Sequence, residues 1–391
     1  MRKHRIWYGV ILIMSVIMYI VANNRSAVAL MLGLILVPII CGLVQLGAMR
    51  KIRITYNVRK SCRIGQEMVL EIKLKRASRL PMGAIHLHMQ MENILFSDKF
   101  TRTIELQPTE KKEQIFLYPL QFETCGDVQL KVVQTTYYDL TGLFCRRKKE
   151  EVELRTLVYP PALKINTHLV RHPETEVPGD MYDSLKKGQD LSEVSGLRDY
   201  AEGDPLRSIH WKLSGKTEGL IVRESGYPSN YNTVVLCDLT KKLDGKPVPY
   251  RCNDAVLALT MSLSYHMLKL NLEHNVVRVI DGECQSIPVD SIESREKMEI
   301  NLLCRPITKE KNSGDSLYYF MRSNLAGKFT KMIYITPNYD EDAVKQLAGK
   351  MDLTIIHIRQ GNASEYADTQ EYSVVPIEVD NYVEKSHNIV I

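Results

Sequence analysis

Long uncharged runs occupy the beginning of the chain. Residues 6–22 and 27–49 contain no charged side chain, and a short polar stretch that includes Arg25 separates them. At a rise of about 1.5 Å per residue, helices of these lengths measure about 26 Å and about 35 Å, against a bilayer hydrocarbon core of about 30 Å. The pattern predicts a two-helix transmembrane hairpin within residues 1–50. A cleaved signal peptide is the alternative for the first run, but a second apolar run follows it directly.

Basic residues flank this hairpin on its two outer sides. Arg2, Lys3 and Arg5 precede the first run, and Lys and Arg are frequent in residues 50–63 after the second, whereas the connecting stretch has only Arg25. Because cytoplasmic flanks of membrane spans carry the excess of Lys and Arg, both termini are expected in the cytoplasm. The sequence therefore predicts a cell-membrane protein with two spans, contacting the lipid bilayer through the hairpin, with its remaining residues in the cytosol.

Residues 51–160 show apolar and polar positions that alternate with a period of two. The alternation covers residues 68–75, 84–91, 114–120 and 127–133, with Gly and Pro between the segments. Short alternating strands at even spacing predict an antiparallel β-sandwich, with an immunoglobulin-like arrangement.

Two features of this region are candidates for binding. His86 and His88 fall on the same face of one strand, so a metal pair is conceivable, although a half-exposed strand face is the preferred interpretation. The run 146–149 is basic throughout and could meet anionic lipid, but we favour a solvated turn.

Residues 161–230 form a polar linker followed by a block dense in charge. Asp204 and Pro205 predict a helix start, because an acidic N-cap followed by proline favours the first helical turn. Residues 206–213 would continue this helix, Trp211 is free to cover an apolar neighbour, and residues 219–224 predict a strand.

Residues 231–391 change to longer alternating elements. Residues 232–238 are a continuous apolar run that ends in Asp, which is typical of a buried parallel strand. Further strands are expected at 275–280, 284–288, 329–336 and 351–358, and a strand-like run at 373–379 is followed by a tail without an assigned role. Helices are expected at 253–270, 292–303, 316–325 and 340–349. This alternation predicts a doubly wound α/β sheet, with ligands expected at the carboxyl ends of the strands.

Overall composition excludes some classes of function. The net charge of +5 over 391 residues is modest, so we expect no nucleic-acid partner. The eight cysteines lie far apart without a CxxC pair or a Cys/His cluster, which indicates reduced, mostly buried thiols and no structural zinc.

The charged block carries a family resemblance. It resembles the signature of the domain of unknown function 58 family, and a second stretch in residues 139–160, with a D-x-x-G-L-F run and a later V-x-P, also resembles it. The matching positions in the block are Arg198, Tyr200, Gly203, Asp204, Arg207, Ile209, Trp211, Lys216, Leu220, Val222, Arg223 and Glu224. The resemblance implies a membrane-anchored protein with a von Willebrand factor type A-like C-terminal domain that works with a MoxR-type AAA+ ATPase.

Such a domain often holds a divalent cation with a D-x-S-x-S loop after its first strand. Here Asp238 and Thr240 fit that loop, but Lys242 places an ammonium where a second hydroxyl oxygen belongs. We therefore expect a degenerate cation-site loop without metal or cofactor, in which Lys242 could pair with Asp238.

Three functions remain open for the protein, and one of them would use the charged block, residues 198–224. Its carboxylates lie beside Arg residues, which lower carboxylate pKa values and make poor general acids. An ion-paired clamp or a protein-docking surface is therefore preferred to catalysis, and we expect a non-enzymatic protein-interaction module. The alternatives are a carboxylate-dependent hydrolase or transferase that uses this block, and a Mg²⁺-dependent adhesion-type domain.

Overall fold

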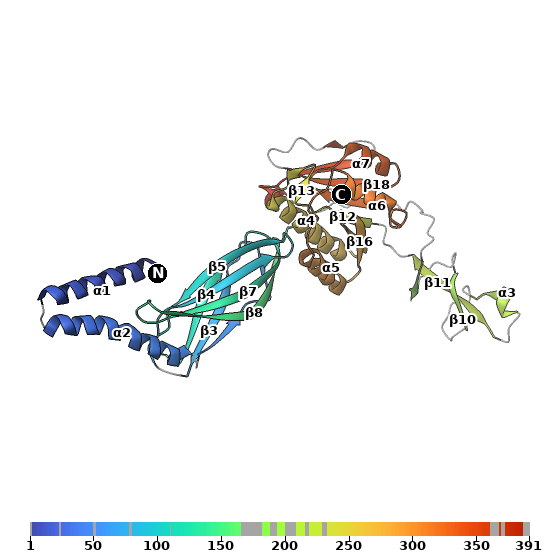
Figure 1. The fold of residues 1–391 in the computed structure, drawn as a ribbon. Helices are drawn as coiled ribbons and strands as arrows, with labels where there is room; N and C mark the ends of the chain where they lie inside the picture. The colour runs from blue at the N-terminus through green and yellow to red at the C-terminus, as the bar shows by residue number, and fades with distance from the viewer. Residues whose placement is uncertain are drawn as a thin grey trace. The chain divides into compact units, whose positions relative to one another are not determined.

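The computed structural model divides the chain into two compact units. It describes residues 2–22, 25–49, 52–77, 80–109, 111–165, 182–187, 194–199, 209–215, 219–228, 233–359, 367–368 and 372–385. The first unit comprises residues 1–161 with 303–306, and the second comprises residues 162–302 with 307–391. Each unit is described by itself below (Figure 1).

Two helices begin the first unit and lie side by side (Figure 1): α1 spans Arg2–Ala22 and α2 spans Arg25–Met49. Helix α2 is long and apolar enough to cross a membrane, whereas the apolar part of α1, Arg5–Val21, is shorter. The second predicted span is thus confirmed as a membrane-spanning candidate by length and composition, and the first stays a prediction.

One hydrogen bond joins the two helices where α2 contains a proline. Pro38 has no N–H and leaves the carbonyl of Leu34, four residues earlier, without its helical donor. The Tyr8 hydroxyl of α1 donates to that carbonyl. The carbonyl that Pro38 leaves without its helical donor thus receives a hydrogen bond from the neighbouring helix.

Two sheets form the rest of the first unit. One has the order β1-β3-β6 and the other the order β2-β8-β7-β4-β5, and all neighbours are antiparallel except β2 and β8. Their inward side chains share one apolar core, to which β3 contributes Leu70 and Ile72 and β4 contributes Leu87 and Met89. The strands are Ile52–Asn57 (β1), Ser61–Arg63 (β2), Met68–Arg76 (β3), Ile85–Asn93 (β4), Asp98–Leu106 (β5), Glu113–Leu120 (β6), Gly126–Tyr138 (β7) and Cys145–Tyr159 (β8).

The alternating segments of the sequence are confirmed as strands, since β3, β4, β6 and β7 cover them. In β4 every second side chain is buried, as a two-sided strand requires. Strand β8 begins with five exposed residues and four of them are basic, so its first half carries no alternating apolar signal.

The turn between β7 and β8 is held by a buried aspartate. Asp139 accepts hydrogen bonds from the backbone N–H of Thr141 (3.2 Å) and of Phe144 (2.9 Å). Gly142 adopts a φ of 69°, which favours glycine. These contacts give the D-x-x-G-L-F run a structural reason: Asp139 and Gly142 fix a tight turn that presents Phe144 at its end.

The second unit contains a small antiparallel sheet of three strands with the spatial order β10-β11-β9. Its strands are Tyr182–Lys187 (β9), Val194–Asp199 (β10) and Ile221–Pro228 (β11), and the helix α3 covers Trp211–Ser214. Strand β11 pairs with both others. The predicted strand at 219–224 is therefore confirmed in position.

The predicted helix in this block is wrong in extent. Ile209 bridges Val222 as extended backbone, so it lies outside a helix. Helix α3 begins only at Trp211, and the His210 side chain caps it by accepting from the N–H of Leu213 at 3.2 Å. Trp211 is 64% exposed. The predicted start at Asp204 lies outside the described residues.

A seven-stranded sheet with the order β16-β15-β12-β17-β18-β20-β19 forms the centre of the second unit. The inner strands run parallel, and the edge strands β16 and β19 are antiparallel to their neighbours. The strands are Thr233–Cys237 (β12), His274–Ile280 (β15), Glu283–Val289 (β16), Lys331–Thr336 (β17), Asp352–Arg359 (β18), Ala367–Asp368 (β19) and Ser373–Glu378 (β20). The predicted strands and the hairpin at 275–288 are confirmed.

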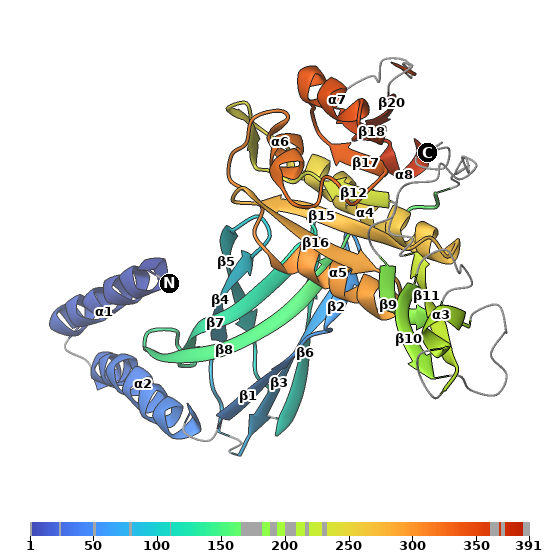
Figure 2. The ribbon, with the colours of Figure 1, turned by 90° about the vertical axis from the view of Figure 1, so that its right-hand side faces the viewer.

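Helices pack on this sheet from both faces. The helices are Tyr250–Lys269 (α4), Ile292–Cys304 (α5), Asp315–Arg322 (α6), Glu341–Ala348 (α7) and Tyr382–Lys385 (α8). On β12, Val234 and Leu236 share an apolar core with α6 and α7. The alternate side chain Cys237 points to the other face, where it meets Thr260 of α4. Figure 2 shows strands β12, β15 and β17 of this sheet together with helices α4 and α6.

Candidate functional site

The carboxyl ends of β12 and β17 place two polar positions together. The strands are parallel neighbours, with Cys237 opposite Ile335, and the N–H of Asp238 donates to the carbonyl of Ile335 at 3.0 Å. Asp238 therefore follows β12 beside Thr336, the last residue of β17. Because ligands of open α/β sheets bind at this edge, the surroundings of Asp238 form the first candidate site.

Four side chains surround the Asp238 carboxylate. Its Oδ1 accepts from the Lys311 ammonium at 2.9 Å and from the Ser316 hydroxyl at 2.8 Å. Its Oδ2 accepts from the Tyr334 hydroxyl at 2.8 Å and lies 3.1 Å from the Thr336 hydroxyl. Both oxygens thus have two polar neighbours, and we call Asp238, Lys311, Ser316, Tyr334 and Thr336 the aspartate cage.

The charged groups of the cage are buried, so solvent hardly screens them. The side chains of Asp238 and Lys311 are 3% and 5% exposed. Burial alone raises the pKa of Asp238, but the Lys311 charge and the hydrogen bonds outweigh it and hold that pKa below the ordinary 3.8. Burial and the Asp238 charge raise the pKa of Tyr334 far above its ordinary value, so its hydroxyl stays a neutral donor. At the centre of the cage, Asp238 and Lys311 form a buried ion pair.

The predicted cation-site positions take other roles. The Thr240 hydroxyl donates to the carbonyl of Lys242 at 2.7 Å, and its backbone is held by Asn253 at 3.1 Å and 2.9 Å. The hypothesis that Lys242 pairs with Asp238 is wrong, because the Lys242 side chain is exposed and the ammonium beside Asp238 belongs to Lys311. This arrangement does not suit a divalent cation, because the Lys311 ammonium already lies 2.9 Å from the Asp238 carboxylate that would have to bind the ion.

A short hairpin positions the backbone of Lys311 next to Asp238. Strands β13 (Lys242–Leu243) and β14 (Lys246–Pro247) are joined by Asp244 and Gly245, both with positive φ, as a two-residue Asp-Gly turn requires. The N–H of Lys311 donates to the carbonyl of Lys242, and the N–H of Asp244 donates to the carbonyl of Lys311, each at 3.0 Å. The hairpin therefore holds the Lys311 backbone from both sides.

The same hairpin carries a second acidic residue. Asp244 accepts from the N–H of Ser313 at 2.7 Å and also from the Ser313 hydroxyl. The Asn338 amide donates to that hydroxyl at 2.9 Å. The Ser313 hydrogen bonds lower the pKa of Asp244, so it is a stable carboxylate at the surface.

An open cleft of about 430 Å³ lies beside these loops. It combines apolar and charged walls at the carboxyl edge of the sheet. The carbonyl of its lining residue Pro337 lies 3.2 Å from His357 Nε2. Burial lowers the pKa of His357 to about 4, so its ring is neutral. The lining residues include Asp244, Lys246, Pro247, Cys252, Pro337, Asn338 and Arg359.

The signature positions of the charged block are only partly described. Arg198 lies in β10 opposite Val222, whereas Arg223 and Glu224 lie in β11 opposite Leu197 and Gly196. Tyr200, Gly203, Asp204, Arg207 and Lys216 lie outside the described residues. The clamp, docking and catalytic hypotheses for this block therefore stay predictions.

The two histidines of β4, His86 and His88, were candidates for binding a metal, and both have polar neighbours within the protein. The two ring nitrogens of His88 lie 3.1 Å from the Thr103 hydroxyl and 3.2 Å from the Thr136 hydroxyl, and His86 Nε2 lies 3.6 Å from Glu105. Within the part of the chain that the structure describes, three His, Cys, Asp or Glu side chains nowhere come together as metal ligands. The eight cysteines are all free thiols.

These features define a protein with a membrane-spanning candidate helix, a β-rich region and an α/β region with a caged aspartate. Residues 196–328 match the family described as "Protein of unknown function DUF58". The predicted resemblance is thereby supported for a segment that runs from β10 to the residues before β17. A search of curated proteins found no match.

Comparison with solved structures gives weak likenesses only. A β-glucosidase from Listeria innocua is 9% identical over 28% of this chain and 16% of that chain, with a TM-score of 0.20. A cohesin module of a Clostridium perfringens family 33 glycoside hydrolase is 10% identical over 28% of this chain and 96% of its own, with a TM-score of 0.19. A CARDB domain from Pyrococcus furiosus is 10% identical over 27% and 86%, with a TM-score of 0.18. At these scores the likenesses support no conclusion about fold or function.

Proposed function

We propose that this protein is a membrane-anchored, cytoplasmic protein-interaction module that works with a MoxR-type AAA+ ATPase and has no catalytic activity of its own. The aspartate cage is the observation that carries the proposal. A general acid or base must exchange protons with a substrate, whereas both oxygens of Asp238 are committed to buried donors inside the protein. The carboxyl edge of the sheet is thus better suited to holding a fixed surface than to turnover.

The surface next to the cage is suited to a protein partner. The cleft of about 430 Å³ mixes prolines with Asp244, Lys246 and Asn338, so that a partner meets apolar contacts and charges of both signs. Interfaces combine such an apolar centre with a polar rim. The hydrogen bonds from Ser313 keep Asp244 in one position, which reduces the entropy that is lost on binding.

The membrane anchor in this proposal is a hairpin of both helices. Helix α1 has 21 residues and would measure about 31 Å, with its basic residues at the beginning. The hydrogen bond from Tyr8 to Leu34 supports a paired arrangement. The basic flanks before α1 and after α2 favour cytoplasmic termini. In the same proposal the two sheets with a shared core are immunoglobulin-like, and the mainly parallel sheet is von Willebrand factor type A-like.

Site-specific photocrosslinking of the full chain in native membranes tests the partner. A photoreactive residue at Lys246, an exposed position on the cleft, is expected to capture the MoxR-type ATPase encoded in the same organism. The matched control is Lys350, which is also exposed but precedes β18 and so lies at the opposite edge of the sheet. Equal capture at both positions, or capture of no ATPase at Lys246, would contradict the proposal.

A further inference from the structure

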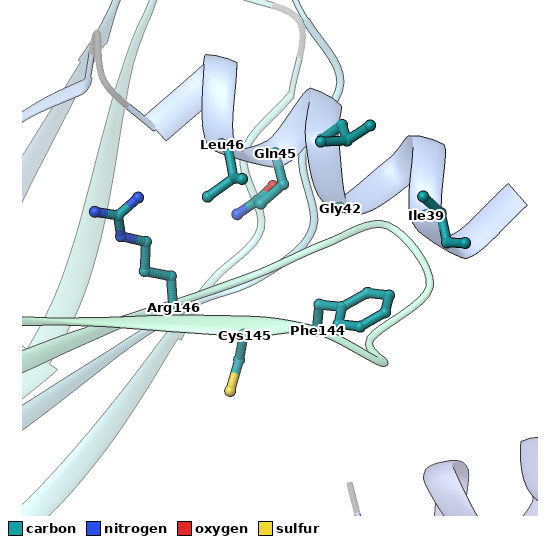
Figure 3. Close-up of a pocket in the computed structure, with 8 residues that line it drawn as sticks. Ile39, Gly42, Gln45, Leu46, Phe144, Cys145 and Arg146 are labelled. Atoms are coloured by element: carbon teal, nitrogen blue, oxygen red, sulfur yellow. The ribbon is translucent and has the colours of Figure 1, made fainter. Parts of the chain in front are cut away.

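A second cavity lies in the first unit, between α2 and the β7–β8 turn. It has a volume of about 310 Å³ and is mostly apolar. Ile39, Gly42, Leu43 and Gln45 of α2 line one side, and Phe144 and Arg146 line the other. Figure 3 shows Phe144 and Arg146 extending from the β8 side toward α2, and Gln45 extending from α2 toward β8. We call this cavity the α2 groove.

Close packing sets one end of the α2 groove. A Cβ atom added at Gly42 would lie 3.3 Å from the ring of Phe144, so glycine lets the aromatic ring approach the helix backbone. Phe144 is nevertheless 50% exposed and Leu140, in the same turn, is 53% exposed. Asp139 fixes the turn, so these apolar side chains are held outward and beside an apolar helix, where a bilayer would cover them.

Gln45 is the unusual residue of the groove. It is 4% exposed, and neither its amide nitrogen nor its amide oxygen has a hydrogen-bond partner. A buried amide without partners costs about 1–3 kcal/mol. Because Gln45 lines the groove, a ligand with both an acceptor and a donor could satisfy this amide.

The position of Gln45 along the helix indicates the depth of that ligand. Helix α2 ends at Met49, so Gln45 lies about 6 Å before the helix end and Ile39 about 15 Å before it. If α2 crosses the bilayer, Gln45 lies near the ester and headgroup level, and Ile39 lies beside the acyl chains. The groove thus runs from a polar to an apolar depth.

Basic residues lie at the polar end. Strand β8 begins at Cys145 and continues with Arg146, Arg147, Lys148 and Lys149, and all four basic side chains are exposed. Lys148 pairs with Glu150 at 3.5 Å. The sequence alone favoured a solvated turn for this run, but Arg146 lines the groove that Gln45 also lines. Excess positive charge next to a membrane surface attracts anionic lipids.

From this arrangement we infer that the α2 groove binds one anionic phospholipid with a hydroxyl-bearing headgroup, of the phosphatidylglycerol type. An acyl chain lies along Ile39, Gly42 and Phe144. The Gln45 amide donates to an ester carbonyl and accepts from a headgroup hydroxyl, while Arg146 pairs with the phosphate. The inference rests on the proposed membrane anchor, because the depth argument needs α2 to span the bilayer.

Native mass spectrometry of the full chain tests this inference. The protein is released from nanodiscs of phosphatidylcholine and phosphatidylglycerol, and the lipids that stay bound are identified. We expect one retained phosphatidylglycerol per chain, and retention about fivefold lower in Arg146→Gln, since one Arg near the surface contributes that much. Arg102→Gln is the matched control, because Arg102 is exposed on β5.

Gln45→Leu separates a lipid site from a purely structural role. The variant removes an unpaired buried amide, so thermal stability without phosphatidylglycerol should not fall, while retention of the lipid drops about fivefold. Gly42→Leu, which fills the groove, should also reduce retention. Equal retention in the wild type, Gln45→Leu and Arg146→Gln, or no preference for phosphatidylglycerol over phosphatidylcholine, would overturn the inference.

These results also distinguish the inference from the proposed anchor. If the anchor is wrong, the chain does not enter nanodiscs of either composition. If the chain enters both but retains lipids without selectivity, the anchor stands and the lipid site fails. Capture of the ATPase at Lys246 is measured independently of both.

Discussion

The Lys311–Asp238 pair gives the sharpest test of the structure. Lys311→Met keeps an aliphatic side chain of similar length and removes the ammonium, which leaves the Asp238 carboxylate buried without its counter-charge. The 2.9 Å pair has side chains that are 5% and 3% exposed, so solvent hardly screens it. Removing one partner of a buried ion pair costs about 3–5 kcal/mol. We expect the free energy of unfolding of the second unit to fall by that amount.

Amide hydrogen exchange of the full chain in nanodiscs measures this loss locally. Peptides from β12 and β17 should exchange roughly 100- to 4,000-fold faster in Lys311→Met, because each 1.4 kcal/mol is about a factor of ten. Lys242→Met is the matched control, since its side chain is exposed, and should change stability by less than about 0.5 kcal/mol. Adding Asp238→Asn to Lys311→Met should recover most of the loss.

The pH dependence provides a second check on the same pair. In the wild type the folded pKa of Asp238 lies below the unfolded value of 3.8, so its stabilisation is complete above pH 3.8 and is lost as the pH falls further. In Lys311→Met, burial without a counter-charge should raise that pKa, so acid should narrow the difference between variant and wild type. The reasoning is refuted if Lys311→Met costs no more than Lys242→Met, or if the gap widens in acid.

Three further outcomes are expected. Tyr334→Phe removes a donor to Asp238 and should cost about 1.5–3 kcal/mol in chemical denaturation, and a cost near zero would deny that this hydrogen bond matters. Gly83→Ala should cost about 1–3 kcal/mol, because its new Cβ would lie 2.2 Å from a backbone oxygen, whereas Gly327→Ala has open space and serves as its control. The folded pKa of His357 is about 4 against an unfolded 6.5, so stability should fall by roughly 3 kcal/mol as the pH drops through this range, and His357→Gln should flatten that fall, which a pH series of thermal unfolding would show.

Elements whose burial follows a simple period could be predicted from the sequence. Strand β4 buries every second side chain, and β12 is buried on both faces, so each left a plain pattern of apolar residues. The position of Asp238 at the end of β12 was visible for the same reason. Strand β8 was missed because its first half is exposed and basic, and its position is set by pairing with β7.

The partner of Asp238 could not be predicted in this way. Lys311 lies 73 positions later, in an irregular segment whose place is set by backbone hydrogen bonds to the β13–β14 hairpin. Nearness in sequence suggested Lys242 instead, which points to solvent. The Asp244-Gly245 pair was an available signal for the hairpin that holds Lys311, since such a dipeptide predicts a two-residue turn.

A positive charge that belongs to a side chain has a fixed stoichiometry of one per molecule. It arrives when the chain folds, and its local concentration does not depend on the composition of the surrounding fluid. A metal held only by coordination can be withdrawn by a chelator or depleted with its free supply, and stability then follows ligand concentration. The loops around the Lys311 ammonium are therefore insensitive to such withdrawal.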